Sequence, residues 1–255
     1  MNANSLMNKV PAVTLAFWII KISATTLGET GGDALSMTLN LGYLVSTFIF
    51  FGFLVVVLAG QIAAKTFHPF LYWAVIVATT TVGTTLSDYL DRTVGLGYPL
   101  SSSILFGCVV ICLVAWRLTT GSVSVSNINT RTAEIFYWVT ILFSNTLGTA
   151  LGDFVATSSG FGFDGGALIF GAALALIAAA YFFLRVDHSW LFWSAFVLTR
   201  PLGATLGDML TKPHAEGGLF LSRISSSLVL AAFMIACILL TERRSEQPPV
   251  SESNS

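Results

Sequence analysis

The chain has 255 residues, of which 55% are hydrophobic and only 10% are charged, and its mean hydropathy is +0.80. This composition excludes an ordinary soluble domain and indicates a protein that lies in a lipid bilayer. The 12 basic and 13 acidic residues give a formal net charge of -1, which excludes a basic surface able to neutralise nucleic-acid phosphates.

Eight apolar segments are long enough to cross the hydrocarbon core of a membrane as helices. The fold class predicted is all-α, a polytopic membrane protein with eight transmembrane helices. We expect a single transmembrane domain over residues 1–241 and a disordered cytoplasmic tail over 243–255, where the sequence is polar and rich in Ser and Pro. In chain order the apolar segments cover about Pro11–Gly32, Gly42–Ile62, Phe70–Ser87, Pro99–Trp116, Glu134–Gly152, Gly165–Leu184, Trp190–Gly207 and Leu219–Leu240.

A repeated motif divides the chain into four units of two segments each. The pattern W-x9-G-x4-D-x8-G occurs four times, although the chain contains only 6 Trp. The units cover about residues 11–65, 66–120, 131–186 and 187–242, and each carries one carboxylate at the same place. In the order of the units, the Trp of the motif are Trp18, Trp73, Trp138 and Trp193, its first Gly are Gly28, Gly83, Gly148 and Gly203, and its Asp are Asp33, Asp88, Asp153 and Asp208.

The text around the repeated Asp reads LGETGGD, VGTTLSD, LGTALGD and LGATLGD. With its Trp, this motif resembles bacterial multi-pass membrane proteins built of four tandem DUF347 repeats, a family of unknown function. The resemblance covers about Ala16 to Arg243 and implies two transmembrane segments per repeat. It implies no activity.

Two-helix units enter the membrane from the same side, so their pseudo-symmetry axis lies along the membrane normal. We expect the first helices of the units to be innermost, because they carry nearly all the polar residues. The positive-inside rule places both termini in the cytoplasm, the repeat Trp at the cytoplasmic interface and the Asp in the outer third of the membrane. The basic residues on which this orientation depends lie near the ends and between units: Lys9, Lys65, Arg117, Arg131, Arg185, Arg243 and Arg244.

The four repeat Asp and Glu29 are candidate ligands of a cation. An ionised carboxylate on a spanning helix usually faces a bundle interior, a partner or a hydrated cavity, so the Asp could line a cation path. The alternative is structural: each Asp caps its helix by accepting hydrogen bonds from loop N–H groups. Each repeat Gly stands four residues before another small residue, a spacing typical of close helix packing. These small residues are Gly32, Ser87, Gly152 and Gly207.

Three charges break the repeat. Lys21 and Glu29 occur only in the first unit, and Arg200 takes the place of Thr25, Thr80 and Asn145 in the fourth. An ion pair between Arg200 and Glu29 or Asp33 would neutralise a buried charge and could act as a gate. For Lys21, which is close to Trp18, the alternative is that its ammonium reaches the near membrane interface.

Two classes of function follow. The first is a transporter or permease in a bacterial inner membrane for a small cation, with hard divalent ions such as Mn²⁺ as candidate cargo for oxygen ligands. The second is a non-transport sensor, assembly factor or scaffold with structural Asp. The sequence shows no nucleophile triad, Walker loop or zinc motif, so an enzyme is not expected. No cofactor is predicted beyond the transported cation, and the expected partners are the bilayer and that cation.

Overall fold

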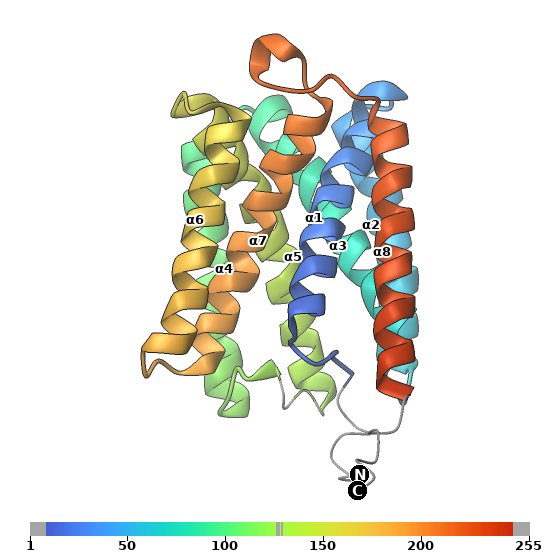
Figure 1. The fold of residues 1–255 in the computed structure, drawn as a ribbon, viewed down its shortest axis with the longest axis vertical. Helices are drawn as coiled ribbons and strands as arrows, with labels where there is room; N and C mark the ends of the chain where they lie inside the picture. Colours follow the sequence, from blue (N-terminus) through green and yellow to red (C-terminus); the bar gives the residue numbers. More distant parts are fainter. Residues whose placement is uncertain (1–8, 126–127, 129, 247–255) are drawn as a thin grey trace, which may run out of the picture.

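The computed structural model describes residues 9–125, 128 and 130–246, and its regular elements are all helical. Each of the first three units has a long helix, a short turn of π-helix and a second long helix (Figure 1). In the fourth unit a 3-10 turn, His214–Glu216, replaces the π turn. The eight α-helices are α1 (Leu15–Asp33), α2 (Gly42–Ala63), α3 (Pro69–Asp88), α4 (Tyr98–Thr120), α5 (Arg131–Asp153), α6 (Gly162–Phe183), α7 (His188–Thr211) and α8 (Arg223–Glu246).

The W-x9-G-x4-D-x8-G motif has a direct structural meaning. Helices α1, α3 and α5 end at the repeat Asp, and the last Gly of the motif turns the chain into the next helix. That Gly has a positive φ of 74°, 75°, 72° and 84° in the four units. Only Gly adopts this conformation without strain, so the final position of the motif is explained by the turn.

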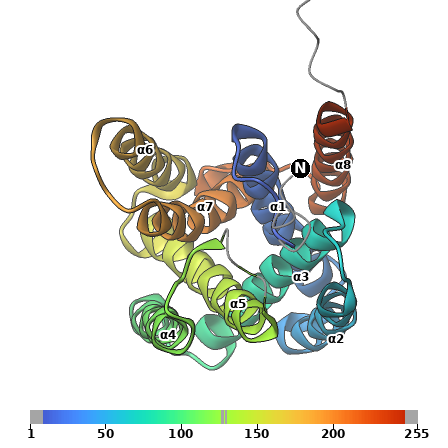
Figure 2. The same cartoon turned by 90° about the horizontal axis from the view of Figure 1, so that it is seen from below.

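The first helices of the units form a closed ring. Helix α1 packs on α3, α3 on α5, α5 on α7, and α7 on α1. Figure 2 shows this ring end-on, with the remaining helices outside it at the four corners. The prediction that the first helices are innermost is confirmed.

Each outer helix packs on the inner helix of the following unit rather than on its own. Helix α2 lies on α3, α4 on α5 and α6 on α7. Helix α8 completes the series by packing on α1. Every unit therefore covers its neighbour, and the last unit covers the first.

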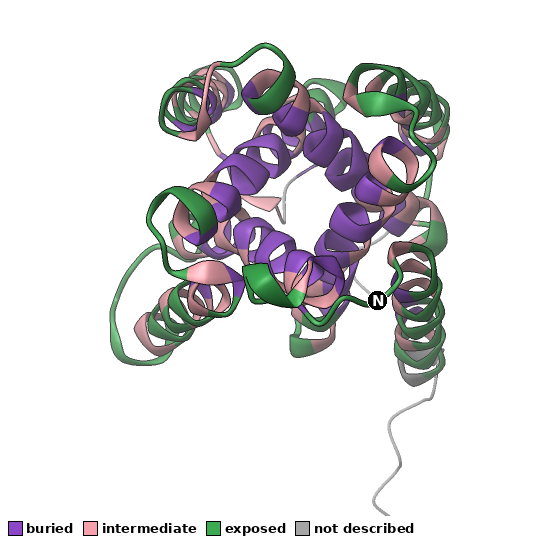
Figure 3. Cartoon of the chain, turned by 90° about the horizontal axis from the view of Figure 1, so that it is seen from above, coloured by how far each residue is buried: buried purple, intermediate pink, exposed green. Residues whose placement is uncertain are grey.

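Burial separates the two sets of helices (Figure 3). The inner helices are mostly buried, whereas the outer helices expose many large apolar side chains, such as Phe48, Leu168 and Leu228. Within the described residues, six helices are long and apolar enough to cross a membrane; α1 and α7 are not among them. Helix α1 carries Lys21, Glu29 and Asp33, which lower its hydropathy. Helices α1 and α7 nevertheless lie in the same bundle as the other helices.

The bundle has two ends, which we call the Trp end and the Asp end after the repeat residues found there. At the Trp end, Trp73, Trp138 and Trp193 are almost fully buried. Their rings make edge-to-face contacts with neighbouring aromatic rings inside the protein. Each of these three indoles therefore fills space between helices.

The described part of the polar C-terminal segment begins as helix, since α8 continues to Glu246. The expected disordered tail starts at 243, so its first residues are helical. Residues 247–255 lie outside the described part of the chain.

Candidate functional site

The inner helices place equivalent residues of the four units in layers along the ring. Counting from the repeat Trp, the positions at -1, +3, +7, +11 and +15 are buried in every unit. Contacts between opposite helices show that these layers meet at the ring axis: Lys21 on α1 contacts Asn145 on α5, and Arg200 on α7 contacts Thr84 on α3. In the order of the units the layers are Phe17, Tyr72, Tyr137 and Phe192; Lys21, Ile76, Ile141 and Phe196; Thr25, Thr80, Asn145 and Arg200; Glu29, Thr84, Thr149 and Ala204; Asp33, Asp88, Asp153 and Asp208.

The repeat Gly let these helices approach closely. A Cβ atom at Gly28, Gly148 or Gly203 would overlap a side chain of the next helix around the ring, at Thr80, Arg200 or Thr25. At Gly83 a Cβ would lie 2.9 Å from the backbone carbonyl carbon of Asn145. The predicted packing role of the repeat Gly is confirmed.

The four repeat Asp form two ion-paired couples at the Asp end rather than one cluster. Arg92 bridges the first couple: its Nε lies 3.0 Å from Asp88 Oδ1 and its Nη2 lies 3.1 Å from Asp153 Oδ2. Arg92 thus joins the Asp of its own unit to the Asp of the next unit. Lys212 makes the same kind of bridge between the fourth unit and the first.

Lys212 Nζ lies 3.1 Å from both Asp208 Oδ1 and Asp33 Oδ2. Arg223 Nε adds a further contact to Asp33 Oδ2, at 3.4 Å. Lys212 follows the end of α7. Burial opposes its charge, but the carboxylates of Asp208 and Asp33 outweigh burial and hold the pKa of Lys212 well above its ordinary value.

The Asp make no capping hydrogen bond to the turn that follows α1, α3 or α5. The structural alternative therefore takes another form, in which the carboxylates hold neighbouring units together by ion pairs. The partners were missed in the sequence, although a signal was present: a basic residue stands four positions after the Asp in units two and four, where units one and three have Met37 and Thr157.

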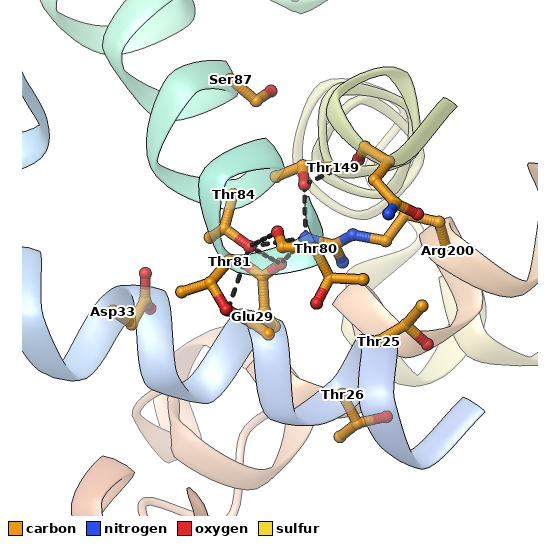
Figure 4. Close-up of polar contacts among 12 residues, drawn as sticks. Thr25, Thr26, Glu29, Asp33, Thr80, Thr81, Thr84, Ser87, Thr149 and Arg200 are labelled. Carbon is orange, nitrogen blue, oxygen red and sulfur yellow. Dashed lines mark hydrogen bonds and ion pairs between the residues drawn. The ribbon is translucent and has the colours of Figure 1, made fainter. Parts of the chain in front are cut away.

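Arg200 lies at the centre of the ring with no exposed surface. Its Nη2 lies within hydrogen-bond distance of Glu29 Oε2, at 2.9 Å, and of Thr84 Oγ1 and Thr149 Oγ1, each at 2.6 Å (Figure 4). These three acceptors belong to α1, α3 and α5, so the guanidinium of α7 links all four inner helices. Of the two partners predicted for Arg200, Glu29 or Asp33, the ion pair is made with Glu29.

Lys21 is also fully buried, which contradicts the alternative that its ammonium reaches the membrane interface. Its Nζ lies 3.4 Å from Asn145 Oδ1 and 4.1 Å from the centre of the Phe196 ring. No carboxylate lies within 4.0 Å of it among the described residues. An amide oxygen and a ring face, rather than a carboxylate, are the neighbours of this nitrogen.

Below Lys21 the axis is closed by aromatic side chains. The hydroxyl groups of Tyr72 and Tyr137 are 2.6 Å apart, and Phe17 and Phe192 occupy the same layer in the other two units. Val10 and Val123 pack against this aromatic cluster at the Trp end, and Trp193 Nε1 donates to the carbonyl oxygen of Val123 at 2.9 Å. The path along the axis is therefore closed at this end.

No group of three or more His, Cys, Asp or Glu side chains in the described ranges is placed to hold a metal ion. The predicted candidate ligands are thus distributed between Glu29 at the centre and two separate couples of Asp. In this arrangement each of these carboxylates binds a cationic group, and that group is a side chain of the protein itself.

Comparison with known families matches four segments of the chain, residues 16–67, 71–122, 136–187 and 191–246, to the family described as "Repeat of Unknown Function (DUF347)". Comparisons with curated proteins and with solved structures return no match. The matched segments coincide with the four two-helix units that build the ring. The chain therefore belongs to the DUF347 family, as four tandem repeats.

Proposed function

We propose that this protein transports a small cation across a bacterial inner membrane, along the axis of the ring of inner helices. The observation that supports this best is the placement of buried acids on that axis. Glu29 and the four Asp lie one layer apart, and each faces the interior of the bundle. Ionised groups at membrane depth are costly, and they usually mark ion pathways.

The orientation belongs to the same proposal. The Trp end faces the cytoplasm and the Asp end faces outward, because most basic residues between units lie beside the Trp end. A cation entering from outside would meet the Asp layer first and Glu29 next. The aromatic layer of Tyr72 and Tyr137 would be the last barrier, so the path is closed at the Trp end in the conformation described.

Arg200 has the position of a gate in this path. Its guanidinium sits on the axis with Glu29, and a fixed positive charge in a pore opposes cations. Transport would require the Arg200–Glu29 pair to separate, which couples movement of the inner helices to passage of the ion.

The ion pairs also favour a second function, that of a non-transport sensor, assembly factor or scaffold. Arg92 and Lys212 give every repeat Asp a cationic partner, which is the arrangement of a bundle held together by buried ion pairs. In that case no ion would cross the ring.

Flux measurements separate the two functions. Purified protein in liposomes would be tested against K⁺, Na⁺, NH₄⁺, Mg²⁺ and Mn²⁺, with protein-free liposomes as the baseline. Transport predicts saturable uptake of at least one ion, reduced in Asp88→Asn while the purified variant remains folded. Uptake equal to the baseline for the whole panel, in both directions, would contradict transport and favour the scaffold.

A further inference from the structure

The hydrogen-bond acceptors around the guanidinium of Arg200 do not match the arrangement of its N–H groups. One nitrogen, Nη2, has three oxygen neighbours at 2.6–2.9 Å, although it carries only two hydrogens. The other two nitrogens, Nε and Nη1, have no hydrogen-bond partner among the described residues. An arginine normally spreads its five N–H groups over a planar array of acceptors, whereas here the acceptors converge on one point.

Three oxygens that converge on a point are the environment of a spherical cation. Both hydroxyl groups can present lone pairs to that point, because each has an acceptor for its own proton. Thr84 Oγ1 lies 3.1 Å from the carbonyl oxygen of Thr80, and Thr149 Oγ1 lies 3.5 Å from that of Asn145. Glu29 supplies one negative charge.

The fourth unit leaves room for the occupant. Units one to three contribute Glu29, Thr84 and Thr149 to this layer, but unit four contributes Ala204, whose methyl group ends against α5 near Gly152. The side chain of Arg200 reaches in from the layer below to occupy that quadrant. The small side chain of Ala204 therefore leaves a space in this layer, and the side chain of Arg200 fills it.

We infer that Glu29, Thr84 and Thr149 form a binding site for a small monovalent cation, in which Arg200 is a tethered occupant that competes with the free ion. A single carboxylate with two neutral hydroxyls balances one positive charge. The three oxygens lie 2.6–2.9 Å from Nη2 of Arg200. These distances exceed the about 2.0–2.1 Å typical of Mg²⁺ and lie at or beyond the upper end of the about 2.3–2.6 Å typical of Ca²⁺, so an ion of the size of K⁺ or NH₄⁺ suits the site. If the proposed transport function holds, this site narrows the transported ion to a monovalent cation. The binding site itself does not depend on that function.

Binding can be tested without transport. Purified protein in detergent would be titrated with RbCl, choline chloride keeping the ionic strength constant, and Rb⁺ binding followed by equilibrium dialysis and thermal unfolding. Arg200→Thr restores the residue that units one and two have at this place and vacates the site. We expect its apparent Kd for Rb⁺ to be lower than that of the wild type by about tenfold or more, because the wild-type site is vacant in only a small fraction of molecules.

Matched variants in the Arg200→Thr background locate the ion. Adding Glu29→Gln or Thr149→Val should weaken Rb⁺ binding, whereas Thr146→Val should not. Thr146 is a buried threonine of the same helix whose hydroxyl bonds only to the carbonyl oxygen of Leu142. Equal losses in Thr149→Val and Thr146→Val would overturn the site.

Three other results would also overturn the inference. The first is absence of saturable Rb⁺ binding to folded Arg200→Thr. The second is equal binding to this variant and to the wild type. The third is failure of both Arg200→Thr and the longer Arg200→Gln to fold, which would make Arg200 an indispensable structural residue rather than an occupant. Absence of flux in liposomes, by contrast, would contradict the transport proposal and leave the binding result standing.

Discussion

The ammonium of Lys212 lies 3.1 Å from Asp33 Oδ2 although 179 residues separate the two in the sequence. The same nitrogen contacts Asp208, one helical turn earlier in its own unit. This bridge joins the last unit to the first and closes the ring at the Asp end. Arg92 makes the matching bridge between units two and three, so the two halves of the chain are related in charge as well as in fold.

Lys212→Met should destabilise the protein strongly. Among the described residues it removes the cation that bridges Asp33 and Asp208 and leaves only the more distant Arg223 beside Asp33. Breaking a buried ion pair costs about 3–5 kcal/mol. Asp33→Asn should cost less when Lys212 is already Met, because the two side chains interact. Unfolding in detergent measures the cycle, and Lys65→Met at an exposed position is the control. Additive effects of the two substitutions would contradict a direct interaction.

The pH dependence of this bridge follows from the raised pKa of Lys212. A group whose pKa is higher in the folded state contributes stability that is complete below its unfolded pKa, about 10.4 for lysine, and is lost as pH rises through the folded value. The stability difference between wild type and Lys212→Met should therefore stay constant from neutral pH to about pH 10 and shrink above it. Melting temperatures measured from pH 7 to 11 test this. A difference that shrinks already near neutrality would contradict the ion pair.

Single and double substitutions of the tyrosine pair should not add. Tyr72→Phe leaves the Tyr137 hydroxyl buried without its partner, at a cost of about 1–3 kcal/mol, and Tyr137→Phe does the reverse. The double variant should be less destabilised than the sum of the two, because Phe is the residue that units one and four have in this layer. Chemical unfolding of the three variants gives the comparison. A double variant at or above the sum would show that the pair is not the source of the cost.

Gly203→Ala should destabilise the ring by about 1–3 kcal/mol, the usual cost of overpacking. Its new methyl group would overlap Thr25 of the neighbouring helix. Gly52→Ala is the matched control: nothing lies within 4 Å of the added atom, in the exposed helix α2, so its effect should stay within about 0.5 kcal/mol. Thermal unfolding compares the two. Equal effects would contradict the packing role of the repeat Gly.

Cysteine labelling tests the proposed orientation. After replacement of the native cysteines, Cys108, Cys112 and Cys237, single cysteines are introduced at two exposed places. Ser159→Cys at the Asp end should react with an impermeant thiol reagent added to intact cells, and Lys65→Cys at the Trp end should react only after the membrane is opened. The opposite pattern would place the acids on the cytoplasmic side.

The sequence was sufficient to predict the units, the inner position of the first helices and the Arg200–Glu29 pair. The first two predictions depended on a pattern within one unit: the spacing of Trp, Gly and Asp, and polar residues confined to one helix of each pair. The ion pair was predicted from charges that depart from the repeat in the first and fourth units. A polar intramembrane residue has few places to go other than the bundle interior, so these patterns determine position strongly.

Relations between units were not predictable in the same way. The packing of α2 on α3, rather than on α1, depends on the crossing of helices in space and leaves no trace in local periodicity. The burial of the repeat Trp was missed because a tryptophan at a helix end is equally typical of a membrane interface and of a packed core. The bridges of Arg92 and Lys212 were missed because both residues lie beyond the predicted apolar segments, which end at Ser87 and Gly207. Their spacing of four from Asp88 and Asp208 nevertheless places each on one helical face with its Asp.

The exchange of outer helices also concerns how the chain can be divided. A break in the linker between α4 and α5 would give two fragments of two units each. Helix α4 of the first would still need α5 of the second, and α8 of the second would still need α1 of the first. In each fragment one outer helix lacks the inner helix on which it packs, and one inner helix lacks its outer cover. Each fragment should therefore need the other in order to fold. A half-length ancestor with the same packing would have been functional only as a dimer.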